Sequence, residues 1–421
     1  MSTAAARAAR DGASRGSVLV INSGSSSLKY SLIDPSREVE LGSGLIERIG
    51  QDAGIVSHTA RVVAEPGEPV PTILDVRHSE ERPIADHHEA FAVMLAQFAE
   101  HGPDLADHPP VAVGHRVVHG GARFFEPTVI TSLVEINIED LSVLAPLHNQ
   151  ANLAGIRAAR AAFSDVPHVA VFDTAFHQTL SPAAYTYALD AAVAREHRIR
   201  RYGFHGTSHK YVSEAAASFL GRDLARLRQI VLHLGNGASM TAVDGGRSVE
   251  TSMGFTPLEG LVMGTRTGDI DPAALFHLSR RAGLDTDELD ELLNKRSGLL
   301  GLAGRSDMRD ILAGRAAGEE AATLAYDVYV HRLRAYLGAY VAQLGGVDVI
   351  VFTAGVGENA VDVRADALAT FGFLGVKLDA ERNGTRGRGI RRISSDDSAV
   401  EVLVVPTDEE LEIARQTLAV I

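Results

Sequence analysis

The chain has 421 residues, of which 45% are hydrophobic and 22% charged, which is typical of a globular protein too long for one ordinary domain. Its formal net charge of −14 argues against a nucleic-acid surface or an anionic membrane as the main partner, and no uncharged apolar run of about 18 residues predicts a membrane span. Because the sequence contains no cysteine, disulfide bonds and thiolate chemistry are excluded.

The first sixteen residues read MSTAAARAARDGASRG and lack the apolar centre of a secretory signal. We expect residues 1–16 to form a disordered N-terminal extension. A mitochondrial-type targeting peptide, which has a similar composition, is the alternative.

Two glycine-rich segments, 18–34 and 230–246, form a loose internal repeat. The first reads VLVINSGSSSLKYSLID and the second reads IVLHLGNGASMTAVDGG. In both, a β-branched run stops at Asn, Gly and Ser, and an alternating segment follows, which predicts a β-hairpin. Two such copies indicate that the chain consists of two related halves.

A third glycine pattern joins a buried-looking strand to a helical pattern in 347–368, through Gly355 and Gly357. Turns of this kind, at the carboxyl ends of parallel strands, are where α/β proteins bind phosphates and nucleotides. The three turns together predict one nucleotide cleft between two α/β domains.

The remaining patterns complete this α/β prediction. Helical spacing marks 89–102 and 319–346, while 111–121 and 168–180 begin as buried strands and end in polar residues. The C-terminal segment predicts a strand and then a helix, with Thr407 as its N-cap and Glu410 at the capping-box position. We predict an N-terminal domain over 17–176, joined by the C-terminal helix 408–421, and a nucleotide-binding domain over 177–407.

The first hairpin carries Lys29, one of only four lysines in the chain. Gly24 permits a tight turn, the serines offer donors, and an ammonium group suits phosphate, although the GxxxxGK[ST] motif is absent. The alternative is a serine-rich hairpin whose lysine faces solvent. In the second hairpin, Asn236 lies between two glycines, which suits either a phosphate clamp or an ordinary left-handed turn.

Cationic groups suited to an anion follow the predicted strands. Arg116 lies at the end of a predicted strand in the segment GHRVVHGG, and Arg266 lies between two glycines in GLVMGTRTGDIDP. Each is a candidate for binding carboxylate or phosphoryl oxygens, or is an ordinary exposed arginine. His205 and His209 have helical spacing, but without a third ligand we expect hydrogen-bond donors to a reacting group instead of a zinc site.

Asp173 stands at the end of an apolar strand, where it is either a helix N-cap or a functional carboxylate. His148 lies among apolar and turn residues and is a candidate donor. Glu410 suits the capping box, which leaves Glu409 freer to contact a metal.

At this point the sequence resembles the acetate kinase family. The resemblance rests on eight ordered motifs that cover the chain from about Val18 to its end: NSGSSSLKY, GHRVVHGG, PLHNQANLAGI, FDTAFHQTL, YGFHGTSHKYV, HLGNGAS, ETSMGFTPLEGLVMGTRTGDIDP and FTAGVGENA. It implies two duplicated actin-like, ribonuclease H-like ATPase domains that close on ATP. It also implies a cytoplasmic homodimer that transfers the γ-phosphoryl group of ATP to acetate with Mg²⁺ or Mn²⁺.

The resemblance assigns roles to individual residues. Asn22 and Glu409 would hold the metal, Arg116 would bind acetate, and Asp173, His205, Arg266 and His148 would complete the catalytic set. A small apolar pocket would come from Val118, Leu147, Phe204 and Pro257. The nucleotide would contact Lys29, His233, Leu234, Gly235, Asn236, Gly237, Asp307, Met308, Arg309, Gly355, Val356, Gly357, Glu358 and Asn359.

The sequence departs from the family pattern at three positions: Gln150 for proline, Glu250 for aspartate and, in the segment SDMRD, Met308 for phenylalanine. None removes a charged catalytic group. Alternatives within the same class are a propionate or butyrate kinase, or an enzyme that uses pyrophosphate. From another class, a non-catalytic ATP-gated module would need no carboxylate-binding arginine.

Overall fold

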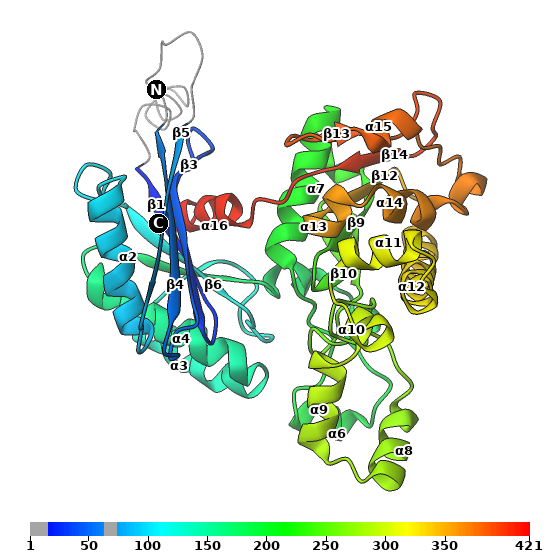
Figure 1. Ribbon diagram of the computed structural model, residues 1–421, viewed down its shortest axis with the longest axis horizontal. Helices are drawn as coiled ribbons and strands as arrows, with labels where there is room; N and C mark the ends of the chain where they lie inside the picture. Colours follow the sequence, from blue (N-terminus) through cyan, green and yellow to red (C-terminus); the bar gives the residue numbers. More distant parts are fainter. Residues whose placement is uncertain (1–15, 63–73) are drawn as a thin grey trace, which may run out of the picture. The chain divides into compact units, whose positions relative to one another are not determined.

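The computed structural model describes residues 16–62 and 74–421 (Figure 1). The expected N-terminal extension therefore lies outside the described residues, except for Gly16. The chain divides into two compact units: unit 1 comprises the described residues up to Ala175 together with Asp408–Ile421, and unit 2 comprises Phe176–Thr407. None of the helices in the described residues is long and apolar enough to cross a membrane.

Unit 1 is built on an eight-stranded sheet with the order β5-β4-β3-β2-β1-β6-β8-β7. Figure 1 shows α2 and α16 on opposite sides of this sheet. The strands are β1 (Val18–Ser23), β2 (Ser27–Asp34), β3 (Val39–Glu47), β4 (Gly54–Val62), β5 (Leu74–Arg82), β6 (Ala112–Val117), β7 (Thr128–Val129) and β8 (His168–Phe172), and the helices are α2 (His87–His101), α3 (Ser132–Asp140), α4 (Pro146–Ala162) and α16 (Glu409–Leu418).

Unit 2 contains a six-stranded sheet with the order β11-β10-β9-β12-β14-β13. Its strands are β9 (Arg228–Leu234), β10 (Ala238–Asp244), β11 (Arg247–Thr251), β12 (Val349–Thr353), β13 (Arg391–Arg392) and β14 (Glu401–Val404). Its helices are α5 (Pro182–Tyr185), α6 (Ala191–Glu196), α7 (Gly206–Leu220), α8 (Pro272–Ala282), α9 (Thr286–Lys295), α10 (Gly298–Ala303), α11 (Met308–Ala316), α12 (Glu320–Leu344), α13 (Ala354–Asn359), α14 (Val361–Leu368) and α15 (Ala380–Gly384).

The two sheets share one five-stranded arrangement. In unit 1, β3, β2 and β1 are antiparallel neighbours and β6 and β8 continue the sheet parallel to β1; in unit 2, β11, β10, β9, β12 and β14 repeat this pattern. Both predicted hairpins are thus confirmed, as is the α/β class. The inner parallel strands β8 and β12 are buried along their whole length, which explains their unbroken apolar sequences.

The start of α16 differs from the prediction. Its N-cap is Asp408, whose carboxylate accepts a hydrogen bond from the Leu411 backbone N–H at 2.9 Å. The Thr407 hydroxyl instead lies 2.7 Å from the Ser208 hydroxyl, and Glu410 pairs with Lys29. The predicted capping box at Thr407 and Glu410 is therefore wrong, because the adjacent aspartate is an equally good cap and leaves Glu410 free for a distant lysine.

The turn into α13 also differs from the prediction. The helix begins directly after β12, so Gly355 and Gly357 lie inside it and do not form a connecting loop. The residue in the left-handed region is Ala354, with φ of 62°. Among the described non-glycine residues this conformation is shared only by Glu38, Arg48, Arg198 and His205, so Asn236 does not form the left-handed turn that was its alternative.

The packing of α16 on the unit 1 sheet requires a glycine. A Cβ atom at Gly114 in β6 would lie 2.5 Å from Thr417 Oγ1 and 2.9 Å from Ile413 Cγ2, both on α16. Real Cβ atoms essentially never make contacts this short, so the Thr417 and Ile413 side chains, or the helix that carries them, would have to move.

We therefore expect Gly114→Ala to lower the free energy of unfolding by about 1–3 kcal/mol through overpacking. Urea unfolding followed by circular dichroism measures it. Gly338→Ala is the control, because it lies in the interior of α12 with no atom near the new methyl group. This control should be stabilised by about 0.5–1 kcal/mol, and equal destabilisation of both variants would contradict the packing argument.

Candidate active-site residues in the two units

In unit 1 an arginine and an aspartate meet at the carboxyl ends of two parallel strands. Arg116 belongs to β6, and Asp173 follows the neighbouring β8. Arg116 Nε donates to Asp173 Oδ1 at 3.0 Å, and Nη2 donates to Oδ2, so the pair is bidentate. Its Nη1 donates to Asn22 Oδ1 at 3.3 Å. Because Asp173 is only 1% exposed, it fixes the plane of the guanidinium firmly.

The electrostatics of this cluster keep Arg116 charged. Burial would lower the pKa of Arg116, but the carboxylates of Asp173 and Glu409 outweigh it and raise the pKa. Burial raises the pKa of Glu409, and Arg116 opposes this shift. One guanidinium thus lies among several carboxylates, which is an arrangement that an added cation would relieve.

Asn22 and Glu409 offer oxygen ligands of the type that Mg²⁺ prefers. Both act on Arg116, the first through a hydrogen bond and the second through its charge. No cluster of three or more His, Asp or Glu side chains in 16–62 and 74–421 could hold a metal by itself. This set fits a Mg²⁺ ion that takes its remaining ligands from substrate and water.

Lys29 lies in the same unit, on β2, and its ammonium group contacts Glu410. Burial would lower the pKa of Lys29, but Glu410 and then Glu409 raise it. The side chain remains 49% exposed, so it could exchange this carboxylate for another anion. Its contact with nucleotide stays a prediction.

Two buried asparagines of α4 hold the loop that follows β6, and sequence reasoning missed them. Asn152 Oδ1 accepts from the Val118 N–H at 3.0 Å, and its Nδ2 donates to the Ser23 carbonyl at 2.7 Å. Asn149 makes the same two kinds of bond with the backbone of His119. The sequence signal that could have identified them is the spacing of Asn149 and Asn152 in PLHNQAN, which places both on one face of a helix.

The other predicted residues of unit 1 lie around this loop and helix. Val118 is 6% exposed, and His148 lies on the exposed side of α4. The side chain of Leu147 is outside the described part of the structure.

In unit 2 a group of histidines surrounds the start of α7 and the β9–β10 turn. His205 precedes α7 with φ of 55°, and its Nδ1 lies 2.9 Å from Ser239 Oγ. His209 Nε2 lies 2.7 Å from the same hydroxyl. The rings of His205 and His233 stack at 4.2 Å. His205 is therefore oriented from two sides.

Arg266 lies beside this histidine group. A Cβ atom at Gly237 would lie 3.1 Å from Arg266 Nη2 and 3.6 Å from the His205 ring. Arg266 Nη1 donates to the Pro257 carbonyl at 2.7 Å. Burial lowers the pKa of Arg266, and no described carboxylate opposes it. A partly buried guanidinium without a carboxylate, next to a glycine turn, is suited to an anion.

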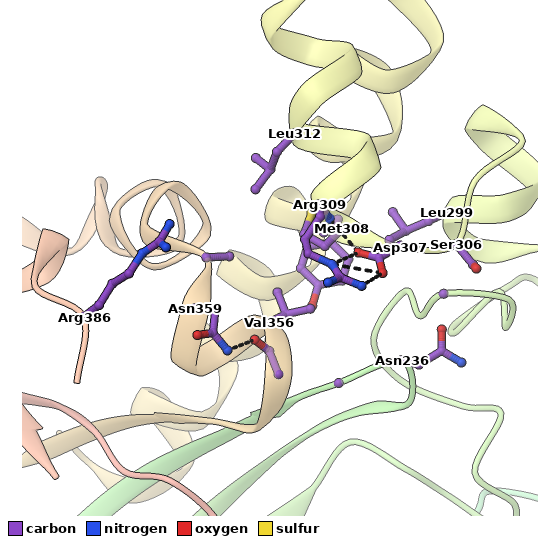
Figure 2. Close-up of a pocket in the computed structure, with 15 residues that line it drawn as sticks. Asn236, Leu299, Ser306, Asp307, Met308, Arg309, Leu312, Val356, Asn359 and Arg386 are labelled. Atoms are coloured by element: carbon purple, nitrogen blue, oxygen red, sulfur yellow. Dashed lines mark hydrogen bonds and ion pairs between the residues drawn. The ribbon is translucent and has the colours of Figure 1, made fainter. Parts of the chain in front are cut away.

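A cavity of about 910 Å³ opens next to the same turn (Figure 2). Figure 2 shows Asp307 and Arg309 at the start of α11 and Asn359 on α13 around it. The predicted nucleotide-binding residues that line it are Gly235, Asn236, Asp307, Met308, Arg309, Gly355, Val356 and Asn359. Sequence reasoning missed further lining residues, namely Gly264, Leu299, Ser306, Leu312, Tyr329, Ala360 and Arg386.

Other predicted residues of unit 2 lie outside the lining of this cavity. Leu234 is buried in β9, Gly357 lies within α13, and Glu358 lines a second cavity.

Asp307, which lines the larger cavity, is the N-cap of α11, and the Arg309 side chain lowers the pKa of Asp307 to about 2. Asp307 therefore stays ionised at neutral pH.

His177 fixes the segment that precedes His205. The ring lies 2.9 Å from the Phe204 carbonyl through Nε2 and 2.8 Å from Ser248 Oγ through Nδ1. Burial lowers the pKa of His177 to about 4, which the Phe204 hydrogen bond only partly opposes. The folded protein therefore holds this imidazole neutral.

This shift predicts acid sensitivity. His177 takes up a proton near pH 6.5 in the unfolded chain but only near pH 4 in the folded protein. Its contribution to the free energy of unfolding is therefore fully present above pH 6.5 and is lost as the pH falls towards 4. When the pH is lowered from 7 to 5, this shift at His177 should reduce the free energy of unfolding by about 2 kcal/mol. His177→Gln should reduce the loss by that amount in urea unfolding at the two pH values, and an unchanged difference would contradict the assignment.

Comparisons with known proteins agree on one family. The acetokinase family model matches residues 17–415. The acetate kinase of Leifsonia xyli subsp. xyli is 65% identical over 95% of this chain and 98% of its own. The crystal structure of Porphyromonas gingivalis acetate kinase has a TM-score of 0.88 at 41% identity and covers 96% and 99% of the two chains. A propionate kinase from Francisella tularensis has a TM-score of 0.87 at 39% identity, covering 96% and 100%. The resemblance found in the sequence is thus confirmed, and the chain belongs to the acetokinase family.

Proposed function

We propose that this chain is a phosphotransferase that reversibly transfers the γ-phosphoryl group of ATP to the carboxylate of acetate. The observation that carries the proposal is Arg266, a partly buried guanidinium that no described carboxylate neutralises, beside a glycine turn and a cavity large enough for a nucleotide. We assign most of the groups for acetate and metal to unit 1, and most of the groups for ATP to unit 2.

Arg116 would bind acetate. Its Nε and Nη2 are used by Asp173, which leaves the Nη1 side, with its longer bond to Asn22, to turn towards a substrate carboxylate. Acetate is already ionised at neutral pH, so the forward reaction needs no general base. We therefore assign Asp173 the orientation of Arg116, and not the removal of a proton.

In unit 2, His205 and Arg266 would stabilise the phosphoryl group during its transfer. Phosphoryl transfer passes through a loose transition state, so preorganised donors and positive charge do most of the catalytic work. Ser239 holds His205 in place, and the Pro257 carbonyl holds Arg266. His148 is kept as a further candidate donor.

The nucleotide would lie in the 910 Å³ cavity, with phosphates at the His233–Gly237 turn. The ionised Asp307 is an acceptor suited to ribose hydroxyls, and Met308, which is 3% exposed, offers an apolar wall for the base. Lys29 is the proposed contact from unit 1.

We propose Mg²⁺ or Mn²⁺ as the metal, held by Asn22 and Glu409. When bound, the ion would neutralise charge on the ATP phosphates. We further propose a cytoplasmic homodimer, as the family resemblance implies.

The activity is tested by trapping acyl phosphate as hydroxamate with Mg-ATP and acetate. We expect hydroxamate to form at a rate that depends on ATP, acetate and metal. Intact ATP binding without hydroxamate would favour a non-catalytic ATP-gated module instead.

Arg116→Ala should lose most of this activity, about a hundredfold or more in kcat/KM, because the positive charge proposed to bind the acetate carboxylate is removed. Its affinity for ATP should stay within about twofold. Arg157→Ala is the matched control, because the ion pairs of this half-exposed arginine within the described residues are with Glu135 and Glu139 on the helices of unit 1. Unchanged acetate turnover in Arg116→Ala would refute its role.

We propose that Val118, Phe204 and Pro257 determine the acyl preference, as the family resemblance implies. One additional CH₂ contributes only about 0.8 kcal/mol when buried, so exclusion of propionate must come from crowding by the valine side chain. We expect acetate to be preferred to propionate, and propionate to butyrate, in parallel kcat/KM measurements. Val118→Ala should lower the ratio of kcat/KM for acetate to kcat/KM for propionate. A wild-type preference for propionate would instead favour the propionate kinase alternative.

A further inference from the structure

A second cavity in unit 2, of about 330 Å³, is lined by four arginines. Arg364 comes from α14, Arg386 and Arg388 from the loop after α15, and Arg391 from β13. We call it the arginine cavity. It shares Asn359 and Arg386 with the larger nucleotide cavity, and α13 contributes residues to both.

Two of the arginines have structural partners. Arg364 is 1% exposed and donates from Nη1 to the Gly357 carbonyl at 2.9 Å, and from Nε and Nη2 to Asn383. Arg391 Nη2 donates to the Glu358 carbonyl at 2.7 Å. These bonds satisfy carbonyls near the end of α13, as cations at a helix C-terminus commonly do.

These bonds do not use all the N–H donors and positive charge of the four arginines. Among the residues that the structure describes, Arg391 Nε is buried without a hydrogen-bond partner. Arg386 and Arg388 are exposed and make no ion pair within the described chain. Burial, and to a lesser degree the positive charge of Arg391, lowers the pKa of Arg364 to about 10.

The acidic group in the cavity does not neutralise them. The Glu358 carboxylate accepts hydrogen bonds from the backbone N–H groups of Thr407 and Ala354, and burial raises its pKa. It acts on Arg391 only through a longer-range attraction. Even with Glu358 ionised, four guanidinium groups face one carboxylate, so the cavity has an excess of positive charge.

We propose that the arginine cavity is a binding site for a free phosphate or pyrophosphate anion, held by Arg386 and Arg388 beside the positive charge of Arg391. Phosphate oxygens match the planar fork of guanidinium groups, and 330 Å³ accommodates an anion of this size. The two exposed arginines are long enough to adjust around it, while Arg364 adds a fixed background charge.

The shared wall links this site to the nucleotide cavity. Asn359 Nδ2 donates to the Gly355 carbonyl at 2.8 Å, and both residues line the nucleotide cavity. An anion that draws Arg386 away from that cavity, or shifts Asn359, would change the affinity for ATP. This coupling rests on the proposed function, whereas the binding itself does not.

The test is isothermal titration of the full chain with pyrophosphate, without divalent metal and with ADP at saturating concentration to fill the nucleotide cavity. We expect one bound pyrophosphate in the wild type. Arg388→Gln, which lies outside the nucleotide cavity, should weaken its affinity about fivefold, as expected for the loss of one exposed charged contact. Higher ionic strength should weaken it further.

Arg392→Gln is the matched control, because this neighbouring arginine pairs with Glu401 and does not line the cavity. It should bind pyrophosphate as the wild type does. The site is refuted if ADP abolishes binding, if no heat is detected, or if the two variants behave alike. The hydroxamate assay, run separately, keeps a failure of the proposed activity distinct from a failure of this site.

Discussion

The constraint on which both units depend is the parallel pairing of strands beside an antiparallel hairpin. In unit 1, β1, β6 and β8 run in the same direction, so Asn22, Arg116 and Asp173 emerge at one edge of the sheet although they are far apart in sequence. In unit 2, β9 and β12 are parallel in the same way, and residues of the turn after β9 and of helix α13, which directly follows β12, line the nucleotide cavity. Polar residues at these edges need no long loops to meet, because the sheet itself brings them together.

Local sequence patterns predicted this architecture well because hairpins and buried parallel strands are specified by neighbouring residues. The glycine turns after Asn22 and His233 and the apolar runs of β8 and β12 were sufficient for the α/β class. The same kind of reasoning failed at α16, where Thr407 and Asp408 are both suitable caps and the choice depends on contacts from elsewhere. Thr407 is held by Ser208, and Glu410 is held by Lys29. Neither contact can be derived from local sequence.

The same distinction between local sequence and distant contacts applies to the site residues. Glycines, arginines and histidines in short motifs were identifiable because their chemistry is distinctive. Asn149 and Asn152, which hold the loop after β6 in place, were not identified, because a buried asparagine reads as a surface residue until its backbone partners are known. Tyr329 and Leu299 reach the nucleotide cavity only through the packing of α12 and α10. Such contributions come from tertiary structure.

Strained residues occur where a strand or turn leads directly into a helix near the candidate site. His205 and Ala354 both have positive φ, which costs an L-residue about 1–2 kcal/mol, and each directly adjoins the start of a helix. Glycine would remove that cost at either position, but at 205 it would also remove the imidazole that Ser239 and the His233 ring orient. The paired and buried strands β9 and β12 of the same unit supply a rigid framework for such conformations. The strain at His205 is therefore best explained by the need to present a side chain immediately before α7, without an intervening loop that would let it move.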